Sequence, residues 1–226
     1  NVAGPRTMVA LVFGQSNSAN HGETRYAPKR EVYNFYDGKC YVAADPLLGA
    51  TGDRGSVWTR LGDMLIESGM YDKVLLVPVG VGGTPVRRWT TTGDLHRRIL
   101  DSIYQLKKKG FKITHIFWHQ GEADVNTPKD DYVKMFTAML EDIRKRGVDA
   151  PIYVAVATRC GSGPASLETQ QAQRELVNTE KGIYPGPFTD ALDTMDDRYD
   201  SCHFSDAGLR KHAALWLAAV KYSGRK

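Results

Sequence analysis

A serine near one end of the chain and an aspartate–histidine pair near the other carry the side chains that acyl transfer requires. Ser16 follows Gly14 and Gln15 directly after the apolar segment 7–13. A tight turn there would expose the serine Oγ and point the N–H groups of the following helix at a bound ligand. The competing interpretation is that Ser16 only caps that helix.

Asp200 and His203 lie on a polar segment close to the C-terminus. At this spacing the carboxylate can hold the imidazole Nδ1–H, which fixes the tautomer and leaves Nε2 free as a base. Pairs of this spacing are common by chance. This one lies where a base could reach a serine that follows the first strand.

Two further segments offer groups that could stabilise an oxyanion. In the first, a backbone N–H of Gly83, or of Gly82 as the alternative, follows the strand expected at 73–79. Pro85 takes the place of the last glycine of a dinucleotide-binding motif, so we expect no nucleotide cofactor. In the second, the side-chain amide of Gln120 follows the strand expected at 113–118.

His119 and Glu122 flank Gln120 and raise the question of a metal. A zinc site uses three protein ligands, and the sequence contains no H-E-x-x-H pattern. We therefore expect no metal, and expect Glu122 and Asp124 to fix their loop instead.

Apolar strands alternate with amphipathic helices along the chain. We expect five strands, at residues 7–13, 31–36, 73–79, 113–118 and 152–157, with a hairpin turn at Asp37-Gly38. We expect helices at about 58–68, 95–106, 132–143, 167–179 and 205–222, the last capped by Ser205. Strands that are apolar on both faces form parallel sheets covered by helices, and ligands bind at the carboxyl ends of such strands. The candidate residues fall at those ends.

Length and composition are those of one α/β domain, residues 1–226. The net charge of +4 comes from 30 basic and 26 acidic residues, too small an excess to indicate a nucleic-acid partner. No apolar run approaches the ~20 residues of a membrane span. The sequence sets no expectation for the oligomeric state.

Four short motifs resemble the characteristic blocks of the SGNH hydrolase superfamily. They are Gly14-Gln15-Ser16-Asn17, Gly82-Gly83-Thr84, Trp118-His119-Gln120-Gly121-Glu122 and Asp200-Ser201-Cys202-His203. More narrowly, they resemble the sialate O-acetylesterase-like branch, which includes the acetylxylan esterases of carbohydrate esterase family six. The matches extend from residue 7 to about 210.

The resemblance implies a flavodoxin-like three-layer α/β/α fold with a five-stranded parallel sheet. It implies hydrolysis of O-acetyl esters on sugars without a metal or other cofactor. Ser16 corresponds to the nucleophile, His203 to the general base and Asp200 to its partner.

The resemblance also assigns the oxyanion donors. The backbone N–H groups of Ser16 and Gly83 carry over directly. The superfamily's third block has an asparagine donor that this chain lacks, and we assign that role to Gln120 as a hypothesis. Ser18 stands where the branch often has Met, which would change the rim of the pocket.

Candidate substrate-binding residues follow two of these loops. Trp89 could stack on a sugar ring, and Arg87 and Arg88 could meet a carboxylate or phosphate on the glycan. The alternative is a Trp buried under neighbouring loops beside solvated arginines. His21 and Glu23 could line the same opening.

Three cysteines, Cys40, Cys160 and Cys202, allow one intramolecular disulfide. A Cys160–Cys202 bond and buried free thiols are both open, because the two cysteines follow predicted strands at the same end of the fold.

The expected function is removal of O-acetyl groups from a carbohydrate, with an O-acetylated glycan as the partner. Three alternatives remain open: an O-acetyltransferase with the same triad, an esterase for lipids or small esters, and a catalytically silent glycan-binding module. Because acetylated polymers lie outside the cell, we expect an extracytoplasmic or secreted location.

Overall fold

A seven-stranded sheet forms the centre of the protein in the computed structural model, which describes residues 2–223. The sheet order is β3-β2-β4-β1-β5-β6-β7. The strands are β1 (Thr7–Gly14), β2 (Val32–Tyr36), β3 (Lys39–Val42), β4 (Lys73–Pro78), β5 (His115–His119), β6 (Ile152–Val156) and β7 (Ile183–Phe188). All neighbours pair in parallel except β2 and β3, which form an antiparallel hairpin. The predicted α/β class is confirmed.

The expected count of five strands is wrong by two. β3 completes the hairpin whose turn was predicted, with positive φ at both Asp37 and Gly38. β7 contains Pro185, Gly186 and Pro187, residues that weaken any strand pattern in a sequence. The order β4-β1-β5-β6-β7 is the flavodoxin-like arrangement, and the hairpin extends it beyond β4.

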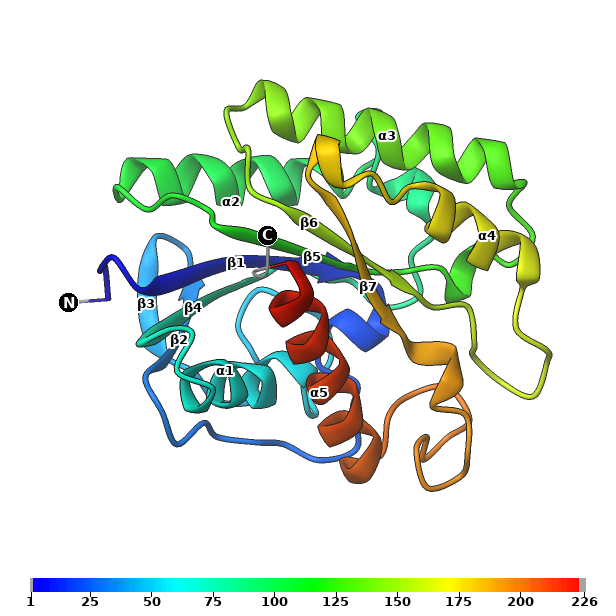
Figure 1. Ribbon diagram of the computed structural model, residues 1–226, viewed down its shortest axis with the longest axis horizontal. Helices are drawn as coiled ribbons and strands as arrows, with labels where there is room; N and C mark the ends of the chain where they lie inside the picture. The colour runs from blue at the N-terminus through cyan, green and yellow to red at the C-terminus, as the bar shows by residue number, and fades with distance from the viewer. Residues whose placement is uncertain (1, 224–226) are drawn as a thin grey trace.

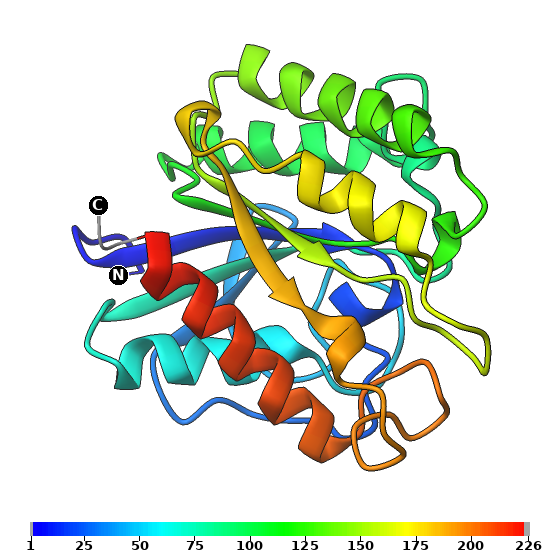
Figure 2. The same ribbon diagram turned by 45° about the vertical axis from the view of Figure 1, so that its right-hand side comes forward.

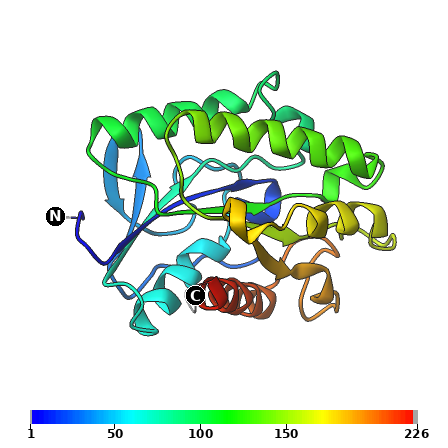
Figure 3. The same cartoon turned by 45° about the horizontal axis from the view of Figure 1, so that its top comes forward.

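Helices cover both faces of the sheet (Figure 1). On one face lie α2 (His96–Lys108), α3 (Lys129–Lys145) and α4 (Leu167–Glu175), and on the other α1 (Val57–Glu67) and α5 (Asp206–Ser223). Figure 3 shows the two layers from another side. Between residues 2 and 223, no helix is both long and apolar enough to cross a membrane.

β1 lies between two hydrophobic cores. Alternate residues of this strand point to opposite faces, so Val9, Leu11 and Phe13 join the core under α2 and α3. Met8, Ala10 and Val12 join the core under α1 and α5. This explains the uninterrupted apolar run in the sequence.

The carboxyl ends of the parallel strands bring distant segments together. The segment after β1 continues into the short helix η1 (Ser16–Ser18). Figure 2 shows the loop before α5, in orange, on the same side of the sheet as η1, in dark blue. The sheet thus places the first and last candidate segments at one edge.

Candidate active site

Ser16 begins η1 immediately beyond β1 and is 5% exposed. Gly14, with φ of 134°, makes this turn possible, because a Cβ there would lie 2.0 Å from the His119 carbonyl oxygen. The indole N–H of Trp58 in α1 donates to the Ser18 carbonyl at 2.9 Å. These contacts fix the backbone that carries the serine.

Asp200 and His203 are joined on the loop before α5. The His203 Nδ1–H donates to Asp200 Oδ2 at 2.7 Å. Oδ1 of the same carboxylate accepts the backbone N–H groups of His203 at 2.6 Å and Cys202 at 3.0 Å. Partial burial alone would raise the pKa of Asp200, but these hydrogen bonds lower it below its ordinary value. The carboxylate is therefore ionised at neutral pH. It binds the imidazole at Nδ1 and makes no contact with Nε2.

Arg198 stabilises the loop that carries Asp200 and His203. It was not identified from the sequence. Its buried guanidinium donates to the carbonyl oxygens of Thr189 at 3.0 Å and Leu192 at 2.6 Å, and also to the carbonyl of Cys202. Because Arg198 donates only to backbone carbonyls, its role is to stabilise the loop. No short sequence motif reveals that role.

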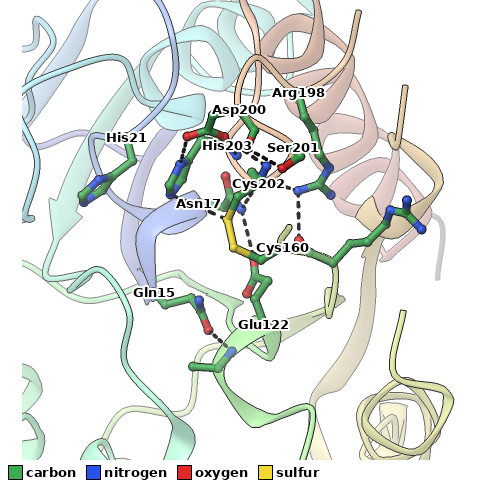
Figure 4. The surroundings of a disulfide bond; sticks show 12 residues. Gln15, Asn17, His21, Glu122, Cys160, Arg198, Asp200, Ser201, Cys202 and His203 are labelled. Carbon is green, nitrogen blue, oxygen red and sulfur yellow. Dashed lines mark hydrogen bonds and ion pairs between the residues drawn. A yellow bond between two sulfur atoms is a disulfide. The ribbon is translucent and has the colours of Figure 1, made fainter. Parts of the chain in front are cut away.

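Asn17 connects the serine segment to the histidine segment. Its side-chain amide donates to Glu122 Oε1 at 2.9 Å and to the Cys202 carbonyl at 3.2 Å (Figure 4). Asn17 follows Ser16 and Cys202 precedes His203, so this contact holds the two candidate catalytic segments side by side. Within the described residues, no hydrogen bond joins Ser16 Oγ directly to His203 Nε2. Catalytic hydrogen bonds are often long in an unliganded site and shorten when substrate binds.

A disulfide bond between Cys160 and Cys202 fastens the same loop to the segment after β6 (Figure 4). Of the two alternatives that the sequence left open, the structure contains the bonded one. Cys40 is the free cysteine.

Gly83 is exposed on the loop after β4, with φ of 69° and open space around its Cα. The N–H of Gly82 donates to Thr51 Oγ1 at 2.8 Å, so that group is already occupied. The N–H of Gly83 has no acceptor within the described part of the chain. Of the two glycines considered, Gly83 has the free donor.

A family model described as carbohydrate esterase, sialic acid-specific acetylesterase, matches residues 6–220. The chain belongs to this family. This match confirms the resemblance that the four sequence motifs indicated. The chain is therefore a member of the carbohydrate esterases.

Individual relatives of this carbohydrate esterase are distant. A probable carbohydrate esterase of Arabidopsis thaliana is 36% identical over 50 residues, which are 22% of this chain and 19% of that protein. A solved structure of a protein from Arabidopsis thaliana aligns with a TM-score of 0.78 at 18% identity, covering 97% of this chain and 99% of that one. NanS aligns with a TM-score of 0.68 at 16% identity, covering 97% and 98%. Likeness at these identities supports the shared fold.

Gln120 of this carbohydrate esterase is fully buried. Its side-chain Nε2 donates to the Thr84 carbonyl at 3.1 Å and to the carboxylate of Asp124, while its Oε1 accepts from the Tyr132 hydroxyl at 3.0 Å. Both N–H groups are therefore engaged inside the protein. We do not retain the side chain of Gln120 as an oxyanion donor.

The predicted role of Asp124 and Glu122 in fixing their loop agrees with the contacts. Asp124 accepts from the Val86 N–H at 2.8 Å and from the Thr127 hydroxyl at 2.7 Å. No group of three His, Cys, Asp or Glu side chains between residues 2 and 223 is arranged to hold a metal ion.

The expectation that Trp89 stacks on a sugar is wrong. Its side chain is 0% exposed, donates to Thr84 Oγ1 at 3.0 Å and packs against Phe13 and Trp118. The neighbouring Arg88 forms an ion pair with Asp94. Arg87 is exposed, and its predicted contact with substrate stays a prediction.

His21 lies beside His203, with the two rings stacked 5.5 Å apart between centroids. Its Nε2 lies 3.3 Å from Thr51 Oγ1, the same hydroxyl that accepts from Gly82. Burial, and then the neighbouring His203, lowers the pKa of His21 below its ordinary value. A neutral His21 therefore borders the segments of both His203 and Gly83, and its predicted contact with substrate stays a prediction.

Proposed function

We propose that this carbohydrate esterase removes O-acetyl groups from sugars through an acetyl-serine intermediate on Ser16. The observation that carries the proposal is the Asp200–His203 pair, tied through Asn17 to the segment of Ser16. The family description supports an acetylated carbohydrate, with O-acetylated sialic acid as the first candidate substrate.

In the first half of the reaction, Ser16 Oγ attacks the carbonyl carbon of the acetyl ester. His203 Nε2 takes the Oγ proton, and the ionised Asp200 stabilises the resulting imidazolium. The bond between the acetyl carbon and the sugar oxygen then breaks. His203 returns the proton to that oxygen, which releases the sugar with a free hydroxyl.

The backbone N–H groups of Ser16 and Gly83 stabilise the negative charge on the acetyl oxygen. Neither group has an acceptor within the described residues. Hydrogen-bond donors that are already in position before the reaction stabilise the oxyanion without any cost of reorganisation. The loss of one such donor typically lowers kcat roughly 10²–10³-fold.

In the second half, water attacks the acetyl-serine. His203 removes a proton from the water, the carbon–Oγ bond breaks, and His203 returns that proton to Ser16 as acetic acid leaves and ionises to acetate in solution. Ser16, His203, Asp200 and the two backbone donors act in both halves, and water is the one further reagent.

Acetate release from a panel of substrates tests this function. The panel contains O-acetylated sialic acids, acetylated xylan, and aryl esters from acetate to octanoate. We expect acetate release from an acetylated sugar and a preference for acetate among the aryl esters. Strong preference for octanoate, or no release from any acetylated sugar, would contradict the proposal.

The same proposal includes an extracytoplasmic location. The Cys160–Cys202 disulfide supports it, because such bonds persist in oxidising compartments.

A further inference from the structure

A groove outside the catalytic loops lies between α2 and the turn that joins β2 to β3. It consists of two adjoining hollows of about 230 Å³ and about 370 Å³, which share Asp37 and Gln105 as lining residues. The turn is held against the helix because the Gly38 N–H donates to Gln105 Oε1 at 3.0 Å (Figure 3). No residue of the proposed catalytic set lines this α2 groove.

Two tyrosines present accessible rings in the α2 groove. Tyr36, which is 47% exposed, lines the first hollow, and Tyr104, which is 66% exposed, lines the second. Neither hydroxyl has a hydrogen-bond partner within residues 2–223. An exposed aromatic ring beside a hollow offers a flat apolar surface with a polar tip, on which a sugar ring can stack.

The second hollow has an excess of positive charge. Lys39, Lys108 and Lys109 line it, and none of the three forms an ion pair in the part of the chain that the structure describes. Among the described residues that line this hollow, Asp37 alone carries a carboxylate. Lysines at the C-terminal end of a helix also complement the helix dipole, but that effect does not require them to line a hollow. The charge therefore favours an anionic group of a ligand.

The first hollow carries polar groups that suit hydroxyls. The Gly38 N–H can only donate, so it fixes the oxygen of Gln105 toward itself, and Gln105 Nε2 has no acceptor among the described residues. The Ser102 hydroxyl has no partner there either. Asp101 adds a carboxylate, which lies 3.5 Å from Arg97 Nε. Donors and acceptors side by side match sugar hydroxyls, because each hydroxyl both donates and accepts.

The segment 49–51 connects the α2 groove to the catalytic edge. Arg98 lines the first hollow, and its Nη2 donates to the Gly49 carbonyl at 2.6 Å. Two residues further along, Thr51 Oγ1 accepts the Gly82 N–H at 2.8 Å. A long glycan held in the groove would therefore stay close to the loop that carries Gly83.

We infer that the α2 groove is a second binding site, which takes acidic oligosaccharide units of the acetylated glycan. Sugar rings stack on the tyrosines, and a carboxylate of the glycan meets the lysines of the second hollow. The choice of a glycan rests on the proposed function and on Asp37. Its carboxylate accepts from sugar hydroxyls but repels a chain of phosphates, which can only accept.

Binding of tetragalacturonate, an acidic oligosaccharide without acetyl groups, tests this site without turnover. In NMR titrations of the wild type, we expect the amide resonances of Gly38, Lys39 and Tyr104 to shift and that of Gly83 to stay unchanged. The methyl ester of the same oligosaccharide, which has no charge, should bind more weakly. Three results would each overturn the inference: no shift in the groove at millimolar ligand, equal affinity for the two ligands, or preferred binding of oligothymidylate.

Variants in the groove are compared with matched positions elsewhere. Lys108→Ala should weaken binding of tetragalacturonate roughly fivefold at low ionic strength, and Tyr104→Ala about two- to tenfold. Lys145→Ala, at the last residue of α3, and Tyr222→Ala, at an exposed position in α5, are the controls and should bind as the wild type does. Equal affinities for groove and control variants would contradict the assignment of the site.

Kinetics on a polymer distinguish failure of this inference from failure of the proposed function. The ratio of kcat/KM on acetylated pectin to kcat/KM on an aryl acetate should fall in Lys108→Ala and Tyr104→Ala and match the wild type in the two controls. An unchanged ratio in the groove variants would overturn the inference and leave the proposed function intact. Absence of acetate release from every acetylated sugar, with tetragalacturonate still bound, would contradict the proposed function and not the groove.

Discussion

The carboxylate of Asp200 accepts two hydrogen bonds from His203, one at 2.7 Å from the ring Nδ1–H and one at 2.6 Å from the backbone N–H. The first bond orients the imidazole and the second fixes the backbone that carries it. An ionised Asp200 therefore determines both the tautomer and the position of His203.

Replacement Asp200→Asn should lower kcat roughly 10³–10⁴-fold, because an amide no longer stabilises the imidazolium and can favour the wrong tautomer. Steady-state kinetics with an aryl acetate measures the loss. Asp196→Asn, on the exposed part of the same segment, should keep the wild-type kcat. Equal kinetics for the two variants would exclude Asp200 from the mechanism.

Removal of the disulfide with Cys160→Ser and Cys202→Ser should lower both stability and activity. The bond closes a segment with a sequence separation of 42, for which the chain-entropy model gives a loss of about 4 kcal/mol in the free energy of unfolding. The backbone N–H and carbonyl of residue 202, which bind Asp200 and Asn17, are kept by serine but lose the cross-link that holds their segment in place, so kcat should fall about tenfold.

Thermal unfolding with and without a thiol reductant checks this prediction. Reductant should lower the Tm of the wild type and of Cys40→Ser, the free-cysteine control, but leave the double variant unchanged. If the Tm of the wild type were unchanged after complete reduction, the disulfide would contribute nothing to thermal stability.

Replacement Trp89→Ala should act on stability and not on substrate binding. The side chain packs against Phe13 and Trp118, so its removal should cost about 3–5 kcal/mol of the free energy of unfolding. Chemical denaturation measures this loss, and the KM of the folded variant should match the wild type. Arg87→Ala, at the exposed neighbouring position, should change stability by less than about 0.5 kcal/mol. A stable Trp89→Ala protein with a raised KM would restore the stacking role.

The protein should lose stability in mild acid. Burial lowers the pKa of His115 from 6.5 to about 4 in the folded state. Because the folded pKa is depressed, the neutral ring's contribution is fully present above pH 6.5 and is lost as the pH falls toward about 4.

His115→Gln keeps hydrogen-bonding groups near the hydroxyls of Tyr71 and Thr114 but does not titrate. Between about pH 7.5 and pH 5, the variant should lose about 1–2 kcal/mol less of its free energy of unfolding than the wild type. Parallel pH dependences in denaturant titrations would contradict this assignment.

The strands that could be predicted from the sequence are those whose burial on both faces leaves a run of apolar residues. β1, β4, β5 and β6 are apolar on both faces, so each forms a continuous apolar run. β7 was missed because it lies at the edge of the sheet and is held there by β6, although Pro185 and Pro187 weaken its local preference. α4 was placed correctly at its start but ends at Glu175, four residues before the expected end.

The position of the candidate site could be predicted from the sequence, because its segments follow the carboxyl ends of strands. Ser16, Gly83 and the Asp200–His203 pair follow strands or precede the last helix, and topology brings their segments to one edge. The orientation of individual side chains does not follow from position along the chain. Gln120 follows a strand, as an oxyanion donor would, and only the partners of its amide show that both N–H groups are engaged.

Labelling by a fluorophosphonate tests the central claim, that Ser16 is the nucleophile. We predict one adduct for each wild-type molecule, located on the peptide that contains Ser16, and loss of both adduct and acetate release in Ser16→Ala. Ser18→Ala is the matched control, because the buried Ser18 Oγ has no hydrogen-bond partner within the described residues. It should label and turn over as the wild type does. An adduct on another residue, or normal turnover by Ser16→Ala, would contradict the account.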